Sequence, residues 1–195
     1  MLYLRQRYRR HRARRRFANA SRVYIADVRP GQVVRLVGKL RYLDEPLTAP
    51  LSERSCAYHE VRIGASVDDP IGKPHSDNGT DFLLQDRSGV ALIRIHKAQM
   101  ILSLDGVLVV PDYVQTSKGP VQRSKVYREG VLTADELVAA VGRATMEVAP
   151  ASLLAAGFAS AAPTGYRDPG QVLSLSSTPE TPLLITDDFS FVPSS

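Results

Sequence analysis

The stretch that decides the fold is DFLLQDRSGVALIRI (residues 81–95). Its two apolar runs flank Asp86, Arg87, Ser88 and Gly89, and apolar runs on either side of a short polar turn are typical of a β-hairpin. We expect Asp86 to fix the turn by accepting hydrogen bonds from backbone N–H groups. Gly89 would supply the positive φ angle that such turns demand.

Further strands are predicted on both sides of this hairpin, because β-branched and apolar residues are punctuated there by turn residues. The segments are GQVVRLVGKLRYL (31–43), bent or bulged at Gly38, then CAYHEVRI (56–63), GVLVVPDYV (106–114), stopped or edged by Pro111, VLSLSS (172–177) and PLLITDD (182–188). The polar, proline-containing segments 44–55 and 67–80 are predicted to be loops, the second an exposed excursion.

Residues 133–148 allow two interpretations. Thr133 and Glu136 have the spacing of a capping box that opens a helix. However, VVRLVGKL (33–40) aligns without gaps with LVAAVGRA (137–144), which matches Gly38 with Gly142. The repeat favours a second bent strand, and we predict a strand while the helix stays open as the alternative. Residues 151–164 are small and apolar, typical of a short helix or a loop packed on the fold.

About eight short strands joined by Gly/Pro loops, with no clear helix, predict an all-β or mostly β fold. We expect a small OB-like barrel or sandwich with long loops and a basic N-terminal arm. The expected organisation is an arm over residues 1–22, one domain over 23–190 and a tail over 191–195.

Positive charge is concentrated in the arm. Residues 1–22 hold nine arginines and no acid, which leaves 16 Lys and Arg against 20 Asp and Glu elsewhere, a net charge of −4. The arm is helical by propensity, but its like charges repel, so we expect it to be frayed or ordered by a partner. The predicted binding residues for an anionic surface or acidic partner are Arg5, Arg7, Arg9, Arg10, Arg12, Arg14, Arg15 and Arg16. The alternative is a solvated tail or a charged flank.

Cysteine and hydropathy patterns exclude several classes of protein. One cysteine, Cys56, cannot close an internal disulfide, and one cysteine with four histidines leaves few donors for structural zinc. No run approaches about 18 apolar residues, and arginines occupy the place of a signal sequence's apolar core. We therefore expect no transmembrane span and no secretion signal, and a cytoplasmic protein that is peripheral at the inner membrane face.

No pattern of catalytic residues stands out. Cys56 and His59 suggest a nucleophile and its base, but residues three apart on a strand point to opposite faces, which favours a buried structural cysteine. Asp68–Asp69 and Asp187–Asp188 lack the spacing of a calcium loop. Phosphate-binding, GxSxG and HExxH motifs are also absent from the sequence. We expect no enzyme activity, no metal and no cofactor.

Four segments, in this order, resemble the domain of GIDE/MULAN-type proteins, also described as the beside-a-membrane domain. They are LTAPLSERSCAYHEVRI (47–63), DFLLQDRSGVALIRI (81–95), REGVLTADELVAAVGRATMEV (128–148) and GYRDPGQVLSLSSTPETPLLITDD (165–188). The resemblance covers about residues 30–190 and implies a β-barrel-like domain next to a membrane. Eukaryotic members place it between two transmembrane helices and before a RING finger with ubiquitin ligase activity, whereas bacterial relatives generally lack the RING.

The resemblance also assigns structural positions in this chain. Pro50 and Ser52 would lie in a loop before the strand that carries Cys56 and Tyr58, and Asp86 and Gly89 would form the hairpin turn. These residues, with Gly38 and Gly142, are expected to hold the fold. The chain lacks the RING zinc ligands and the transmembrane helices, so ubiquitin ligase activity and integral membrane topology are not expected.

Three functions remain. The first is a non-enzymatic binding or adaptor domain that acts in protein–protein interaction, with the arm at an anionic membrane surface. The second is an OB-like protein that binds RNA or single-stranded nucleic acid, for which Tyr42, Tyr58, Phe82 and Tyr113 are the candidate stacking residues. The third is an uncharacterised hydrolase built around Cys56, His59 or His96. The sequence identifies neither the partner nor the oligomeric state.

Overall fold

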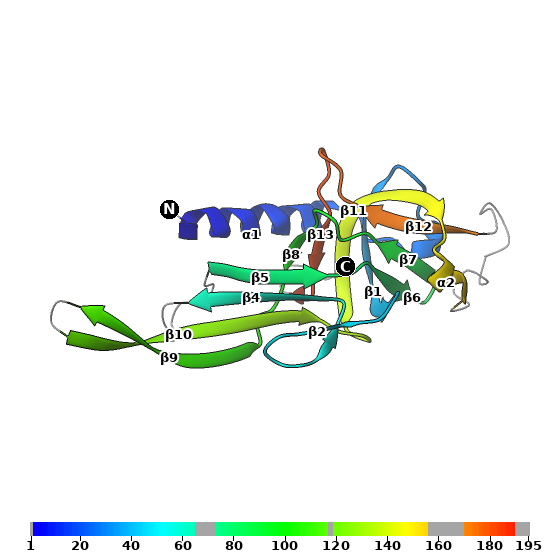
Figure 1. Cartoon of the computed structure of the whole chain (residues 1–195). Coiled ribbons are helices and arrows are strands. Elements are labelled where there is room, and N and C mark those ends of the chain that lie inside the picture. The colour runs from blue at the N-terminus through cyan, green and yellow to red at the C-terminus, as the bar shows by residue number, and fades with distance from the viewer. Residues whose placement is uncertain (1, 65–72, 117–118, 156–169, 190–195) are drawn as a thin grey trace.

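The fold is described by a computed structural model for residues 2–64, 73–116, 119–155 and 170–189. It begins with helix α1 (Leu2–Asn19) and a short 3-10 helix, η1 (Ile25–Asp27). Strands then dominate, and α2 (Ala151–Ala155) is the other described α-helix. Figure 1 shows a barrel on one side and a second sheet that projects from it in the same direction as α1. The mostly β prediction is confirmed.

Five strands close the barrel. They are β1 (Val33–Tyr42), β6 (Phe82–Asp86), β7 (Gly89–Ile93), β12 (Gln171–Ser176) and β11 (Leu137–Val148). Each pairs with the next in that order, and β11 pairs with β1 to complete the ring. β7 and β12 are parallel and the other pairs are antiparallel, which makes a small mixed barrel of the OB-like kind. β13 (Leu184–Thr186) and β8 (Gln99–Ile101) extend the sheet beyond β11.

The barrel interior is filled by alternating side chains. On β6, Phe82 and Leu84 point into the main core, where they join Leu36, Ala140 and Leu173 from other strands. The side chains between them face outward, because successive residues on a strand point to opposite faces. Local alternation therefore builds the barrel wall.

The two described helices cover different outer faces of the barrel. Leu83 of β6 and Leu92 of β7 are buried on the outside beside Leu153 of α2. On another face, Ala13 and Phe17 of α1 pack over β11 and β13. The exterior of the barrel is consequently apolar beneath both helices.

The second sheet is built from two insertions into the barrel. β4 (Tyr58–Gly64) and β5 (Lys73–Gly79) lie between β1 and β6 in the sequence, and β9 (Gly106–Thr116) and β10 (Gly119–Leu132) lie between β8 and β11. They pair in the order β5-β4-β10-β9, so β10 joins one insertion to the other. A small hairpin of β2 (Leu47–Thr48) and β3 (Ser55–Cys56) lies in the predicted 44–55 loop and also takes up Cys56, so the strand predicted over 56–63 begins at Tyr58 as β4.

Two predictions about loops and turns are wrong. The predicted excursion over residues 67–80 contains strand β5, which forms because a polar segment obtains its backbone hydrogen bonds from β4 rather than from burial of apolar side chains; residues 67–72 lie outside the described residues. Gly89 does not have a positive φ angle, since Arg87 and Ser88 make the turn and Gly89 already pairs with Asp86 in the ladder.

Residues 137–148 are confirmed as a strand. Glu136 does accept a hydrogen bond from the Thr133 backbone N–H at 2.9 Å, as in a capping box, but the contact closes a turn before β11. The two copies of the repeat, in β1 and β11, pair with each other, with Gly142 opposite Val34 and Gly38 opposite Val138. A Cβ atom on Gly38 would lie 2.6 Å from the Gln85 carbonyl oxygen, which explains glycine at this position by close backbone approach.

Candidate functional site

The arginine-rich segment forms helix α1, which is anchored at its C-terminal end. Ala13 and Phe17 are one helical turn apart and buried on the same face, against Ala139, Val141 and Leu184. The sequence predicted an arm that is helical by propensity but frayed or ordered by a partner, whereas in the structure the last turns of this helix pack on the barrel. The apolar pair at positions 13 and 17 was the sequence signal for this packing.

Two arginines fasten the same end of α1 by hydrogen bonds. Arg16 donates from Nη2 to the Pro182 carbonyl oxygen at 2.8 Å, and Arg35 of β1 donates from Nη1 to the Phe17 carbonyl oxygen at 2.9 Å. A cation at the last carbonyls of a helix also interacts favourably with the helix dipole. Burial lowers the pKa of Arg35, and the charge of Arg22 lowers it further. Arg35 is thus an anchor that sequence reasoning missed.

The predicted binding arginines divide into two groups. Arg12, Arg14 and Arg15 are exposed on the anchored half of the helix, and Arg16 is half-buried. Burial, and then the charge of Arg12, lower the pKa of Arg16. Arg5, Arg7, Arg9 and Arg10 lie on the preceding turns, and their side chains are outside the described part of the structure. In Figure 1 these turns extend away from the barrel toward the N-terminus.

The loop that carries Pro50 and Ser52, two residues that the family resemblance singles out, lies against the buried carboxylate of Glu129. Glu129 of β10 accepts hydrogen bonds from the backbone N–H groups of Leu51 and Ser52, at 2.8 and 3.0 Å. These residues follow Pro50 in the loop between β2 and β3. No sequence signal pointed to Glu129, because its burial depends on a loop that folds back from a distant part of the chain.

Cys56 and Tyr58 are both buried. Cys56 packs with Ala49 and Val131. Burial raises the pKa of the Cys56 thiol, and the charge of Glu129 raises it further. A nucleophilic cysteine needs the opposite shift. The Tyr58 hydroxyl donates a hydrogen bond to the Asp77 carboxylate. Burial is the largest cause of the raised pKa of Tyr58, and the charge of Asp77 raises it further.

Asp86 organises the hairpin turn and ties it to the segment after α1. Its Oδ1 atom accepts from the backbone N–H groups of Ser88 at 2.7 Å and Gly89 at 3.0 Å, the hydrogen bonds expected from the sequence. Its Oδ2 atom accepts from the Ile25 backbone N–H at 2.9 Å. Both carboxylate oxygens of Asp86 therefore accept hydrogen bonds from backbone N–H groups.

The residues considered for chemistry lie on different elements of the fold. Cys56 is in β3, His59 is half-buried on β4, and His96 is exposed after β7. Asp68 and Asp69 are outside the described residues, while Asp187 accepts a hydrogen bond from the Ser103 backbone N–H at 2.8 Å. Within the described ranges, no three His, Cys, Asp or Glu side chains gather as metal ligands would.

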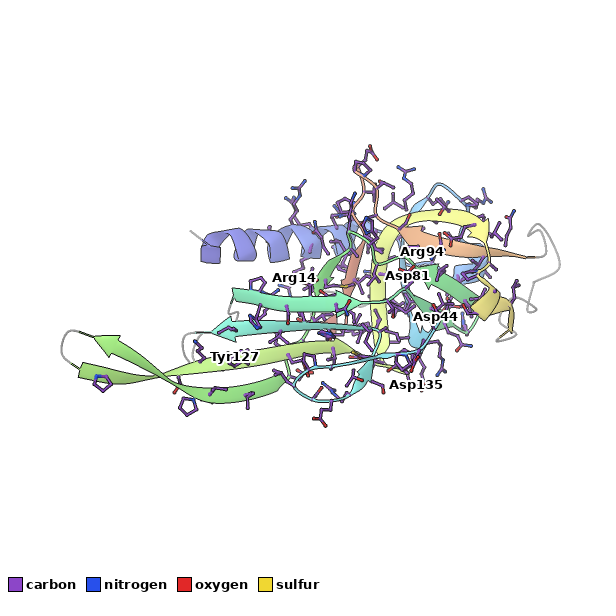
Figure 2. All side chains as sticks on the ribbon, viewed as in Figure 1. Arg14, Asp44, Asp81, Arg94, Tyr127 and Asp135 are labelled. Atoms are coloured by element: carbon purple, nitrogen blue, oxygen red, sulfur yellow. The ribbon has the colours of Figure 1, made fainter. Side chains whose placement is uncertain are left out.

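A charged cluster that the sequence did not reveal joins Arg94, directly after β7, to Asp81, directly before β6, and to Glu147 of β11. Arg94 donates to Asp81 at 2.8 Å and also pairs with Glu147, and Figure 2 shows Asp81 and Arg94 together at the barrel. Hydrogen bonds to Glu147 and Asp81 raise the pKa of Arg94. Every group in this cluster has an opposite charge beside it, so the cluster ties strands together.

Comparisons with protein-family models, curated proteins and solved structures find no match to this chain. The resemblance to GIDE/MULAN-type domains therefore stays a prediction from the motifs quoted above. Among the described residues, neither helix combines the length and apolar character that crossing a membrane requires.

Proposed function

We propose that this protein is a non-enzymatic adaptor that docks on an anionic membrane surface through α1 and presents its β domain to a protein partner. One observation carries the proposal. The arginines occupy a helix that is held to the barrel only near its C-terminal end in the described contacts, and residues 23–195 have a net charge of −4. Positive charge is thus displayed away from the acidic body.

The charge on α1 is large enough for surface binding. Eight arginines lie within residues 2–19, and no acidic residue lies in the first turn. Each Lys or Arg near an anionic bilayer contributes about 1 kcal/mol. An anionic surface would also relieve repulsion between arginines four residues apart, such as Arg12 and Arg16. Several arginines acting together therefore suffice for reversible docking.

The contacts of the barrel weigh against RNA or single-stranded nucleic acid as the main partner. Tyr58 and Phe82, two candidate stacking residues, are buried, and the Tyr42 hydroxyl donates to the Ser55 carbonyl oxygen at 2.6 Å. OB-folds bind oligonucleotides on the face of their second and third strands. Here those strands are β6 and β7, whose outer leucines are buried beside α2. Tyr113 has no described side chain.

Co-sedimentation with lipid vesicles tests the proposal. The full chain is mixed with phosphatidylcholine vesicles that either contain or lack phosphatidylserine. One variant loses four arm charges through Arg9→Gln, Arg10→Gln, Arg12→Gln and Arg15→Gln. A matched control loses four exposed charges of the β domain through Arg29→Gln, Lys39→Gln, Arg54→Gln and Arg87→Gln.

We expect the arm variant to bind anionic vesicles about a hundredfold or more weakly, and the control to bind like the native chain. Equal losses in both variants would show that overall charge, rather than α1, drives binding. Single-stranded RNA added as a competitor separates the two partner classes. If RNA binds the chain more tightly than vesicles do, the nucleic-acid function replaces the membrane function.

A further inference from the structure

Strand β9 exposes a run of four consecutive aliphatic residues. Val107, Leu108, Val109 and Val110 are 56, 47, 47 and 38 % exposed. We name residues 107–110 the aliphatic edge. β9 is the last strand of the order β5-β4-β10-β9, so among the residues that the structure describes it has β10 on one side and no strand on the other. An exposed edge segment without charged side chains, such as residues 107–110, readily pairs with another strand.

The exposed side chains lie on both faces of the sheet. Val107 and Val109 stand opposite Arg128 and Val126 of β10, and Leu108 stands opposite Tyr127. Successive residues of a strand alternate between faces. A flat partner on either face would leave half of the aliphatic edge in water, whereas a strand added beside β9 would continue both faces.

Insertion of this edge into lipid is disfavoured by the backbone. The unpaired N–H and C=O groups of an edge strand need hydrogen-bond partners, and the hydrocarbon core of a bilayer offers none. Pro111 follows directly and has no N–H group, which is typical of the solvent side of an edge strand. The partner that satisfies residues 107–110 is therefore an extended strand that ends near Pro111.

We propose that this strand is β9 of a second copy of the chain, paired antiparallel about a two-fold axis. The aliphatic edge carries no charge, so no like charges face each other where residues 107–110 of the two copies pair. An isologous contact of this kind matches every residue with a counterpart of the same strand. The two four-stranded sheets join into one sheet with β9 next to β9 at its centre.

The position of α1 agrees with this pairing. In Figure 1, α1 and β9 lie on opposite sides of the other strands of the sheet. The two-fold axis at β9 therefore places the two arginine-rich helices at the far ends of the dimer, where their charges stay apart. The dimer does not depend on what α1 binds. It adds a second arm, and two linked arms bind a shared surface more strongly than one.

The contact is small, so the dimer dissociates on dilution. A few residues on each copy fall well below the area of a permanent dimer interface. Sedimentation equilibrium of the full chain over a concentration series should give a mass that rises from one copy to two. Val109→Lys should weaken the association about tenfold or more, because lysines from both copies enter the centre of the joined sheet.

Val148→Lys is the matched control, since Val148 is exposed on β11 of the barrel. It should associate like the native chain. A native chain that stays monomeric at the highest concentration overturns the proposal. So does a dimer that Val109→Lys leaves intact, because its interface then lies elsewhere.

Disulfide cross-linking gives a readout that does not depend on the lysine variant. Cys56, the only native cysteine, is fully buried and gives little background. Four variants are made, each with one added cysteine at position 107, 108, 109 or 110. A position at or next to the two-fold axis brings two Cβ atoms within the distance that a disulfide needs, about 3.5 to 4.5 Å.

We expect covalent dimers at one or two of these positions and none with Val148→Cys. Equal cross-linking at all five positions would indicate random collision and would contradict the pairing. Absence of cross-links at all four edge positions would also overturn it.

Discussion

The barrel and the four-stranded sheet differ in whether their outermost strands have neighbours on both sides. Each barrel strand has a neighbour on both sides, and helices α1 and α2 cover parts of the outer wall. The projecting sheet ends at β9, whose aliphatic residues are exposed. Closure removes edges, and an open sheet retains them. The barrel is thus built for stability, and the sheet and α1 are the parts available for contacts.

The largest difference between the two regions is expected in the free energy of unfolding, for a matched pair of leucine substitutions. Leu84 of β6 is fully buried in the barrel core, and Leu108 of β9 is about half exposed. Leu84→Ala should lower the free energy of unfolding by about 2 to 5 kcal/mol, because it removes buried contacts and leaves a cavity. Leu108→Ala should lower it by less than about 1 kcal/mol.

Urea denaturation at a low protein concentration, where the dimer is dissociated, measures both variants. Similar losses from the two substitutions would show that β9 is as tightly packed as the barrel. The contrast between the regions would then fail.

A second pair tests how tightly the barrel wall is closed. A Cβ atom on Gly38 would lie 2.6 Å from a backbone oxygen, so Gly38→Ala should cost about 2 kcal/mol or more. A Cβ atom on Gly89 would lie 3.4 Å from a side-chain methyl group of Ile25, so Gly89→Ala should change stability by less than about 1 kcal/mol. Thermal unfolding compares them. A tolerated Gly38→Ala would mean that β1 and β6 can separate at this point.

An effect smaller than those of Leu84→Ala and Gly38→Ala is expected at Asp187, which follows β13 and accepts a hydrogen bond from the Ser103 backbone before β9 begins. Burial raises the pKa of Asp187 to about 6, although the Ser103 N–H opposes the shift. The folded state therefore binds the proton more tightly than the unfolded state. The stability that this carboxyl provides is complete below pH of about 4 and is lost as the pH rises through about 6.

Asp187→Asn should accordingly stabilise the protein at pH 7, by about 1 to 2 kcal/mol, and have little effect at pH 4. The asparagine carbonyl can still accept the Ser103 hydrogen bond. Unfolding free energies of both proteins across this pH range check the sign. A variant that is less stable at pH 7 would show that the charged carboxylate is the favoured form.

The barrel strands were predictable because their signals are local. β6 and β7 follow from two apolar runs around Asp86, and β11 follows from its similarity to β1. The repeat outweighed the capping-box pattern because its apolar positions had partners in β1 and β12. A strand whose own residues alternate between apolar and polar can be predicted without knowing which distant residues it pairs with.

The second sheet was only partly predictable because it depends on pairing between insertions. β5 is polar and becomes a strand through β4, and Glu129 is buried because the β2–β3 loop returns to it. Neither event leaves a local pattern. The charge of the arm was evident from the amino-acid composition. The exposure of residues 107–110 could be recognised only from the order of the strands in the sheet.

Hydrogen–deuterium exchange with and without anionic vesicles tests the central claim that α1 is the docking element. We predict that bound vesicles slow amide exchange in α1, with the largest change before the anchored residues 13–17, and leave exchange in β6 and β7 unchanged. Vesicle-dependent protection on β6 and β7, together with unchanged exchange in α1, would contradict it.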